Sequence, residues 1–197
     1  MSVSLQKGQK VSLTKENAGI SKVIVALGWD EAKKGLLKGL FSQKTEDIDC
    51  DASAFLLRDG HLVEKKDIVY FGNLTHESGT VCHMGDNLTG AGSGDDEQIV
   101  IDLQKVPSIY DRIVIVVNIY QAQRRGQHFG MVQNAFIRIV DGRNNNEMFR
   151  YNLTDNYSGM TALIFGEVYR NGDEWKFNPI GQGTTDRSIT ELSKRYT

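Results

Sequence analysis

Short apolar runs rich in β-branched and aromatic residues recur along this chain of 197 residues, and turn-forming residues separate them. Such runs are typical of β-strands, because branched and aromatic side chains suit the half-buried surface of a sheet. Several runs alternate apolar and polar residues, as in 136–140, which indicates sheets with one hydrated face. The strands that we expect span 9–13, 22–29, 52–57, 68–71, 80–83, 98–103, 112–120, 134–140, 147–153, 162–170 and 174–179.

Turn and helix signals between these runs narrow the fold class further. Segments 141–146 and 170–173 combine Asn, Asp and Gly, as hairpin connections do. The best helix signal is the capping-box pattern from Ser188 to Glu191 near the C-terminus. No Pro-rich linker or internal repeat divides the chain. We therefore expect an all-β protein with one domain over residues 1–197, a two-sheet β-sandwich with a short C-terminal helix.

Composition excludes several classes of protein. Lys and Arg number 23 against 25 Asp and Glu, so the chain lacks the basic field that dominates nucleic-acid binding, and no nucleic acid is expected as its main partner. The N-terminus lacks the apolar core of a signal peptide, and no apolar run approaches the ~20 residues of a membrane span. Cys50 and Cys82 form no CxxC pair, which fits free thiols in the cytoplasm.

The segment 85–98 holds four carboxylates together with Asn87 and Thr89 among four glycines. Calcium takes about 6 to 8 oxygen ligands in loose geometry, some of them backbone carbonyls that a chain supplies by turning sharply. Glycine allows such turns because it reaches positive φ without a Cβ clash. The segment therefore suits a calcium site, and a solvated acidic loop is the alternative.

A second acidic cluster lies upstream, where Asp47, Asp49 and Asp51 occupy alternate positions before an apolar run. In an extended chain these side chains share one face, where like charges repel unless a cation or a solvated bend relieves them. An EF-hand is excluded, because Ala52 and Arg58 stand where its loop requires Gly and Glu. If the two clusters meet, they form a patch of six carboxylates that suits two divalent ions: Asp49, Asp51, Asp86, Asp95, Asp96 and Glu97.

Several motifs together resemble the TerD family of bacterial tellurium-resistance and stress-response proteins. They are Leu-Gly-Trp-Asp at 27–30, Asp-Cys-Asp-Ala-Ser-Ala at 49–54, Gly-Asp-Asn-Leu-Thr-Gly at 85–90, Asp-Asp-Glu at 95–97, Glu-Trp-Lys-Phe at 174–177 and Gly-Gln-Gly at 181–183. Their order and spacing match the family over nearly the whole chain. Segments 33–41 and 185–189 are similar to the TerZ branch in particular.

The resemblance implies a cytoplasmic, calcium-binding β-sandwich that holds its ions, two in number, between acidic loops. Carried over by position, the implied side-chain ligands are Asp49, Asp51, Asp86, Asn87, Asp95, Asp96 and Glu97, and carbonyls from 88–94 complete the shells. One departure weakens the match, because Ala91 and Ser93 stand where the family loop commonly carries acidic residues. The function implied is that of a non-enzymatic, metal-dependent interaction module in tellurite resistance, with other proteins of the same stress-response system as partners.

Three other interpretations stay open at this stage. A metal-dependent phosphoester hydrolase or a nucleotide-binding module could use the same two ions, although no Ser–His pair or nucleophile elbow is evident. The apolar segment 36–41 covers a sheet edge or, as the alternative, meets a partner or a membrane surface. The basic segment 121–129 reads as a solvated hairpin loop or, less favoured, as a docking site for an anionic partner.

Overall fold

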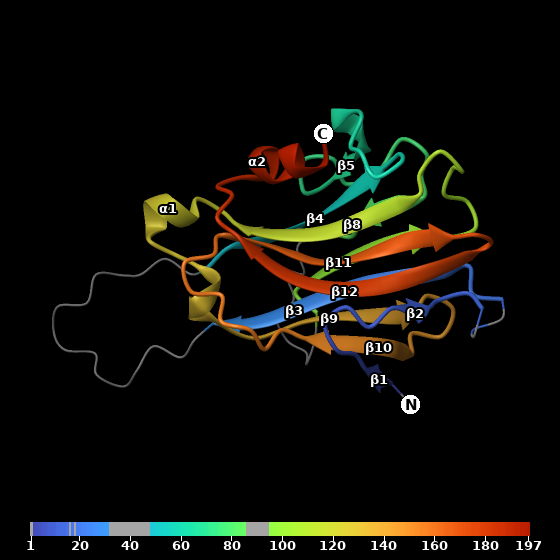
Figure 1. Ribbon diagram of the computed structural model, residues 1–197, viewed down its shortest axis with the longest axis horizontal. Coiled ribbons are helices and arrows are strands. Elements are labelled where there is room, and N and C mark those ends of the chain that lie inside the picture. The colour runs from blue at the N-terminus through green and yellow to red at the C-terminus, as the bar shows by residue number, and fades with distance from the viewer. Residues whose placement is uncertain (1, 16, 18, 32–47, 86–94) are drawn as a thin grey trace, which may run out of the picture.

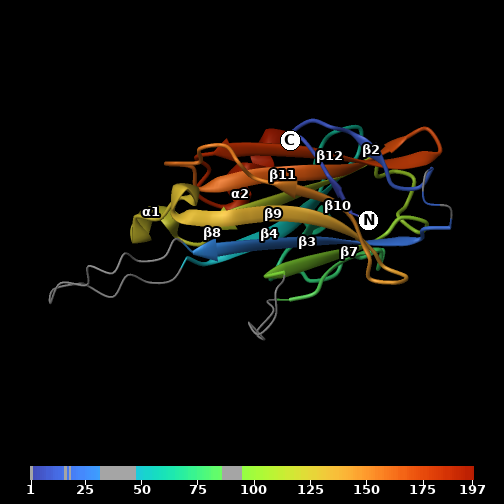
Figure 2. The same ribbon diagram turned by 90° about the horizontal axis from the view of Figure 1, so that it is seen from below.

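The computed structural model describes residues 2–15, 17, 19–31, 48–85 and 95–197. In this part of the chain, two six-stranded sheets pack face to face as the two layers of a sandwich (Figures 1 and 2). The predicted fold class is thereby confirmed. Within the described residues, no helix is long and apolar enough to cross a membrane.

The first sheet has the long strand β3 near its centre. Its order is β1 (Val3–Ser4), β10 (Glu147–Asn152), β9 (Val132–Asp141), β3 (Lys22–Glu31), β7 (Glu97–Asp102) and β6 (Val81–His83). β1 pairs with β10 in parallel, and the other neighbours are antiparallel. The hairpin predicted across 141–146 is confirmed, because it joins β9 to β10.

The second sheet is antiparallel throughout its described pairs. Its order is β2 (Val11–Ser12), β12 (Glu174–Thr184), β11 (Ala162–Asn171), β8 (Arg112–Ile119), β4 (Cys50–Leu57) and β5 (Ile68–Val69). The predicted hairpin at 170–173 joins β11 to β12. β12 continues beyond the predicted end at 179, because Pro179 lies next to an irregularity in the β11–β12 register, where its missing N–H is tolerated.

The main core lies between the sheets, where side chains such as Val25 of β3 and Ile115 of β8 are fully buried. A smaller apolar cluster covers the outer face of the second sheet, and Phe55 and Leu192 belong to it. Helix α2 (Ile189–Ser193) and the 3-10 helix η3 (Lys194–Tyr196) close this cluster near β4 and β5 (Figure 1). The predicted helix cap is confirmed, because the Glu191 N–H donates to the Ser188 hydroxyl at 3.2 Å.

The prediction of a hairpin loop at 121–129 was wrong. This segment carries the chain from β8 in one sheet to β9 in the other, through helix α1 (Ala122–Arg125) and the 3-10 helix η2 (Phe129–Met131). Left-handed backbone at Gln121 and Gly126 turns the chain at both ends of α1. Two short elements also went unpredicted, β1 and the 3-10 helix η1 (Lys65–Asp67).

Gly181 lets the two sheets approach closely at the edge where β10 meets β12. Its φ is +57°, and a Cβ built there would lie 2.3 Å from the hydroxyl oxygen of Tyr151 in the opposite sheet. The Tyr157 hydroxyl donates to the Gly181 carbonyl at 3.0 Å. A larger residue at 181 would therefore meet both backbone strain and a steric clash.

Gly181→Ala and Gly172→Ala should separate these two costs, since Gly172 also has positive φ, +63°, but has no atom within 4 Å of a built Cβ. We expect Gly172→Ala to lower the free energy of unfolding by about 1 to 2 kcal/mol, and Gly181→Ala by a further 1 to 3 kcal/mol or so from overpacking. Tyr151→Phe should restore part of the second loss. Chemical denaturation measures all three, and equal losses at both glycines would contradict the steric argument.

Candidate functional site

Described parts of both acidic clusters approach each other where the start of β7 meets the start of β4, because Glu97 accepts a hydrogen bond from the Ala52 N–H. Cys50, the first residue of β4, is buried, and this burial raises the pKa of its thiol well above the ordinary value. The carboxylates of Glu97, Asp51, Asp49 and Asp96 raise that pKa further. Four carboxylates from both clusters therefore act on one thiol, and we call these four the acidic group.

Glu97 joins the two sheets within the acidic group. It is 6% exposed, and its Oε2 accepts a hydrogen bond from the backbone N–H of Ala52 in the opposite sheet. The same oxygen lies 3.4 Å from Nε2 of His83. The Nδ1 atom of His83 accepts from the Gly85 N–H at 3.0 Å, which assigns the ring proton of a neutral His83 to Nε2, facing Glu97.

Asp96 ties the acidic group to β3. Its Oδ2 accepts from the backbone N–H of Trp29 at 2.7 Å, and its own N–H donates to the Leu27 carbonyl at 2.7 Å. The side chain and the backbone of Asp96 are therefore both fixed against β3. The Leu-Gly-Trp-Asp motif at 27–30 therefore helps to position a predicted metal ligand.

Asp95 has a different environment from that of its neighbours. Its two oxygens accept from Nε and Nη2 of Arg138, each at 2.8 Å, and Gln98 donates to it at 2.9 Å. This pairing raises the pKa of Arg138, chiefly through the hydrogen bonds from Arg138 to Asp95. Such a bidentate ion pair is among the stronger side-chain contacts. A cation bound by Asp95 would therefore have to compete with the guanidinium.

The remaining predicted ligands fall into two sets. Asp51 lies on the outer face of β4, where it lines a pocket with Ser53. Asp86 and Asn87, with the glycine-rich stretch that contains Ala91 and Ser93, lie outside the described residues, as does segment 36–41. In the part of the chain that is described, no three Asp, Glu, His or Cys residues are grouped so as to hold one metal ion.

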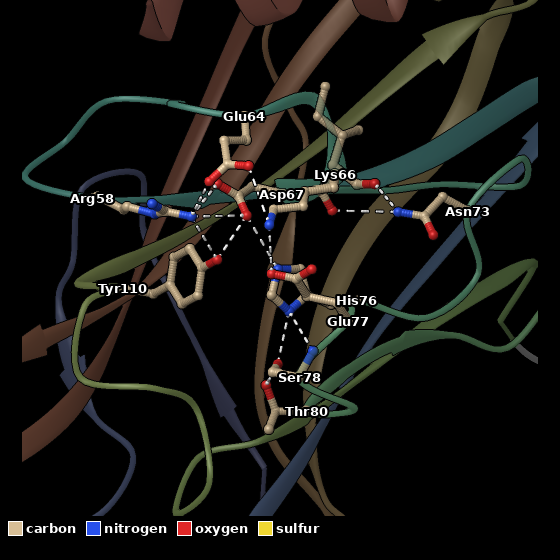
Figure 3. Close-up of polar contacts among 11 residues, drawn as sticks. Arg58, Glu64, Lys66, Asp67, Asn73, His76, Glu77, Ser78, Thr80 and Tyr110 are labelled. Carbon is tan, nitrogen blue, oxygen red and sulfur yellow. Dashed lines mark hydrogen bonds and ion pairs between the residues drawn. The ribbon is translucent and has the colours of Figure 1, made fainter.

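A second polar cluster surrounds Asp67, a fully buried carboxylate that the sequence did not single out (Figure 3). Its oxygens accept from the Tyr110 hydroxyl at 2.7 Å and from Nη2 of Arg58 at 3.1 Å. Nε2 of His76 lies 3.3 Å away. These partners are spread over residues 58–110 without a characteristic spacing, so no local motif reveals the cluster.

His76 also contacts Ser78, which gives an Asp–His–Ser order resembling that of hydrolase triads. The distance from His76 Nδ1 to the Ser78 hydroxyl is 2.7 Å. However, the Ser78 backbone N–H donates to the same nitrogen, and the Ser78 hydroxyl lies 2.7 Å from that of Thr80 (Figure 3). The hydroxyl thus belongs to a hydrogen-bond network that attaches the segment between β4 and β6 to the sandwich.

Comparisons with known proteins identify relatives along the whole chain. The model of the TerD domain matches residues 1–196. Stress response protein SCP2 of Bacillus subtilis (strain 168) is 54% identical over 100% of both chains. Tellurium resistance protein TerD of Serratia marcescens is 48% identical and covers 93% of this chain and 91% of its own.

The expectation of a particular closeness to TerZ was wrong. Tellurium resistance protein TerZ of Serratia marcescens is 40% identical over 96% of this chain and 94% of its own, well below SCP2. The fold also matches a solved structure, described as a homologue of telluride resistance protein (TerD) from Streptomyces coelicolor A3(2). Its TM-score is 0.65 at 21% identity, and the match covers 91% of this chain and 99% of that one.

Replacing Glu97 tests its role between the sheets. Because a single oxygen faces both Ala52 and His83, Glu97→Gln can keep both contacts, whereas Glu97→Ala leaves a buried N–H without its acceptor. In EDTA we expect the Ala variant to lose about 2 to 4 kcal/mol of unfolding free energy and the Gln variant less than about 1 kcal/mol. Urea unfolding measures both losses. Equal losses would show that the charge of Glu97, and not its position as an acceptor, supports the fold.

Proposed function

The chain belongs to the TerD family, and we propose that it is a calcium-binding, non-enzymatic stress-response protein that contributes to tellurite resistance. The names of its relatives support the stress-response and tellurium part of this proposal. The calcium part is carried by one observation, the hydrogen bond that Glu97 of one acidic cluster accepts from the N–H of Ala52, the residue that follows Asp51 of the other.

Calcium fits the chemistry of the acidic group. Carboxylates are hard oxygen ligands, and Ca²⁺ accepts irregular sets of about 6 to 8 oxygens. Like charges gathered at a partly buried site repel each other, and a bound divalent cation would relieve that repulsion. We propose that Asp49, Asp51, Asp96 and Glu97 bind calcium together with ligands from 86–94, namely Asp86, Asn87 and backbone carbonyls. Two ions are expected from the number of carboxylates.

Asp95 has a secondary part in this proposal. Its oxygens already accept from Arg138, so binding calcium through Asp95 would weaken a bidentate ion pair. We therefore expect Asp95 to contribute less to calcium affinity than Asp49 or Asp96. Bound calcium would change the charge presented by this end of the sandwich, which is how the protein would signal occupancy to partner proteins of the same system.

The buried histidines and the buried thiol support a non-enzymatic role. Both ring nitrogens of His76 contact protein groups, and so do those of His83, which leaves these nitrogens poorly placed to act as general bases. The raised pKa of Cys50 keeps its thiol protonated, and a protonated thiol is a weak nucleophile for direct reduction of tellurite. Free Cys50 and Cys82 suit the reducing cytoplasm, where we place the protein.

Calcium affinity should depend on both acidic clusters at once. We expect Asp49→Asn and Asp96→Asn each to weaken calcium binding by about tenfold or more, and the double variant to lose less than the sum, because the first loss already disables the shared site. Asn keeps the size and one oxygen of Asp, so damage to packing is small. Isothermal titration calorimetry of metal-stripped protein measures these changes.

Two matched variants serve as controls. Asp173→Asn in the exposed turn between β11 and β12 should leave calcium affinity unchanged. Asp95→Asn should have a smaller effect than either single variant. Strictly additive losses from Asp49→Asn and Asp96→Asn would mean that the two clusters serve separate sites, and this outcome would contradict the proposal.

Tellurite survival tests the link between calcium and biology. In a host that depends on this protein for tellurite resistance, the Asp49→Asn, Asp96→Asn double variant should reduce survival to near the level of the deletion strain. Asp173→Asn, expressed equally, should protect fully. If a double variant that no longer binds calcium still gives normal resistance, calcium is not needed for this function.

A further inference from the structure

A pocket of about 290 Å³ opens on the outer face of the second sheet, away from the core between the sheets. Its walls come from β4, the end of β8, the turn after β5 and the segment that leads into α2. Its volume is at the lower end of the range found for small-molecule sites, about 300 to 1,000 Å³. Neither the family relationship nor the calcium proposal assigns a role to it.

Ser53 gives the first sign that this pocket binds a ligand. The residue lines the pocket and is only 1% exposed, yet its hydroxyl has no hydrogen-bond partner among the described residues. A buried hydroxyl without a partner is unfavourable, because it has lost its hydrogen bonds to water. Because native proteins satisfy most buried polar groups, the hydroxyl is best explained by a molecule that completes its hydrogen bonding.

Gln121 adds a second unsatisfied group to the same pocket. Its Nε2 donates to the Tyr120 hydroxyl at 3.0 Å, and its Oε1 is buried without a partner in the described chain. With the amide in this orientation, the free atom is an acceptor. Asp51 and Arg187 also line the pocket, so its wall carries one charge of each sign. The two unsatisfied oxygens, of Ser53 and Gln121, favour a ligand edge that carries N–H donors.

Three aromatic side chains supply flat apolar surface around these polar groups. They are Tyr70, Phe71 and Tyr120, and the last two are 61% and 41% exposed. The rings of Tyr70 and Phe71 meet edge to face, with centroids 5.2 Å apart. Gly72 permits this arrangement, since a Cβ there would lie 2.7 Å from the Tyr70 ring. Aromatic faces beside buried acceptors suit a flat ring with a polar edge.

We propose that this pocket binds a small planar heteroaromatic molecule that carries an exocyclic amino group and has the size of a free nucleobase or nucleoside. The amino group would donate to the Ser53 hydroxyl and Gln121 Oε1, and the ring would lie against Phe71 and Tyr120. Asp51 lines this pocket and is also a proposed calcium ligand, so base binding is measured both without and with calcium.

Matched pairs of bases test the proposal on the full-length protein. Adenine and hypoxanthine have nearly the same shape but differ in an amino against an oxo group, and cytosine and uracil form a second such pair. By ligand-observed NMR and calorimetry in EDTA, we expect adenine or cytosine to bind with Kd below about 1 mM and its oxo partner at least about tenfold more weakly. Adenosine tests whether the pocket accepts a nucleoside.

Repeating the titrations with saturating calcium separates the two proposals, because binding of the base in EDTA does not require the metal site. Failure of calcium binding would leave the pocket result untouched, and failure of base binding would leave the calcium result untouched. If adenine and cytosine do not bind by about 1 mM, or if the oxo bases bind equally well, the proposed recognition is wrong.

Variants assign any observed binding to this pocket. Ser53→Ala removes the unsatisfied hydroxyl oxygen and adds no atom, so the fold should be retained while affinity falls by about tenfold. Phe71→Ala, at an exposed position, should weaken binding by a similar factor through lost stacking. Val63→Ala, also exposed but outside the pocket lining, is the control. Unchanged binding in both pocket variants would place the ligand elsewhere and overturn the assignment.

Discussion

The buried carboxylate of Glu97 links the two sheets where the start of β7 meets the start of β4. It stands between the sheets, accepts from the backbone of Ala52 and faces Nε2 of His83. Burying a charge costs several kcal/mol unless hydrogen bonds and nearby charges compensate for it. Strands β4, β6 and β7 must therefore keep their relative positions, and these positions bring Asp49 and Asp51 to the same end of the sandwich as Asp96.

The negative charges of neighbouring acidic residues are compensated in different ways. The guanidinium of Arg138 forms an ion pair with Asp95 and offsets its charge. Asp96 accepts a backbone hydrogen bond from Trp29 and is one of four carboxylates that raise the pKa of Cys50. The Trp29 N–H fixes the position of the Asp96 carboxylate without cancelling its charge. Under the calcium proposal, a divalent cation from solution would offset the charge of this group.

The strand pattern and both hairpins could be predicted from sequence, because alternation and turn chemistry act over a few residues. The Ser188 helix cap is equally local. The pairing of Asp95 with Arg138 could not be predicted from the sequence, because it joins positions 43 residues apart and depends on which strands become neighbours. The Asp67 network was missed for the same reason. The crossover at 121–129 was missed because Gln121 adopts positive φ, which non-glycine residues rarely do.

A crystal structure of the calcium-loaded protein tests the central claim most directly, because it shows which oxygens contact each ion. The account predicts carboxylate oxygens from both acidic clusters, Asp49 or Asp51 from one and Asp96 or Glu97 from the other, at about 2.3 to 2.6 Å from one ion or an adjacent pair. The Arg138–Asp95 pair should survive. Calcium bound by residues of one cluster alone, or crystals grown in calcium with no ion at this end, would contradict it.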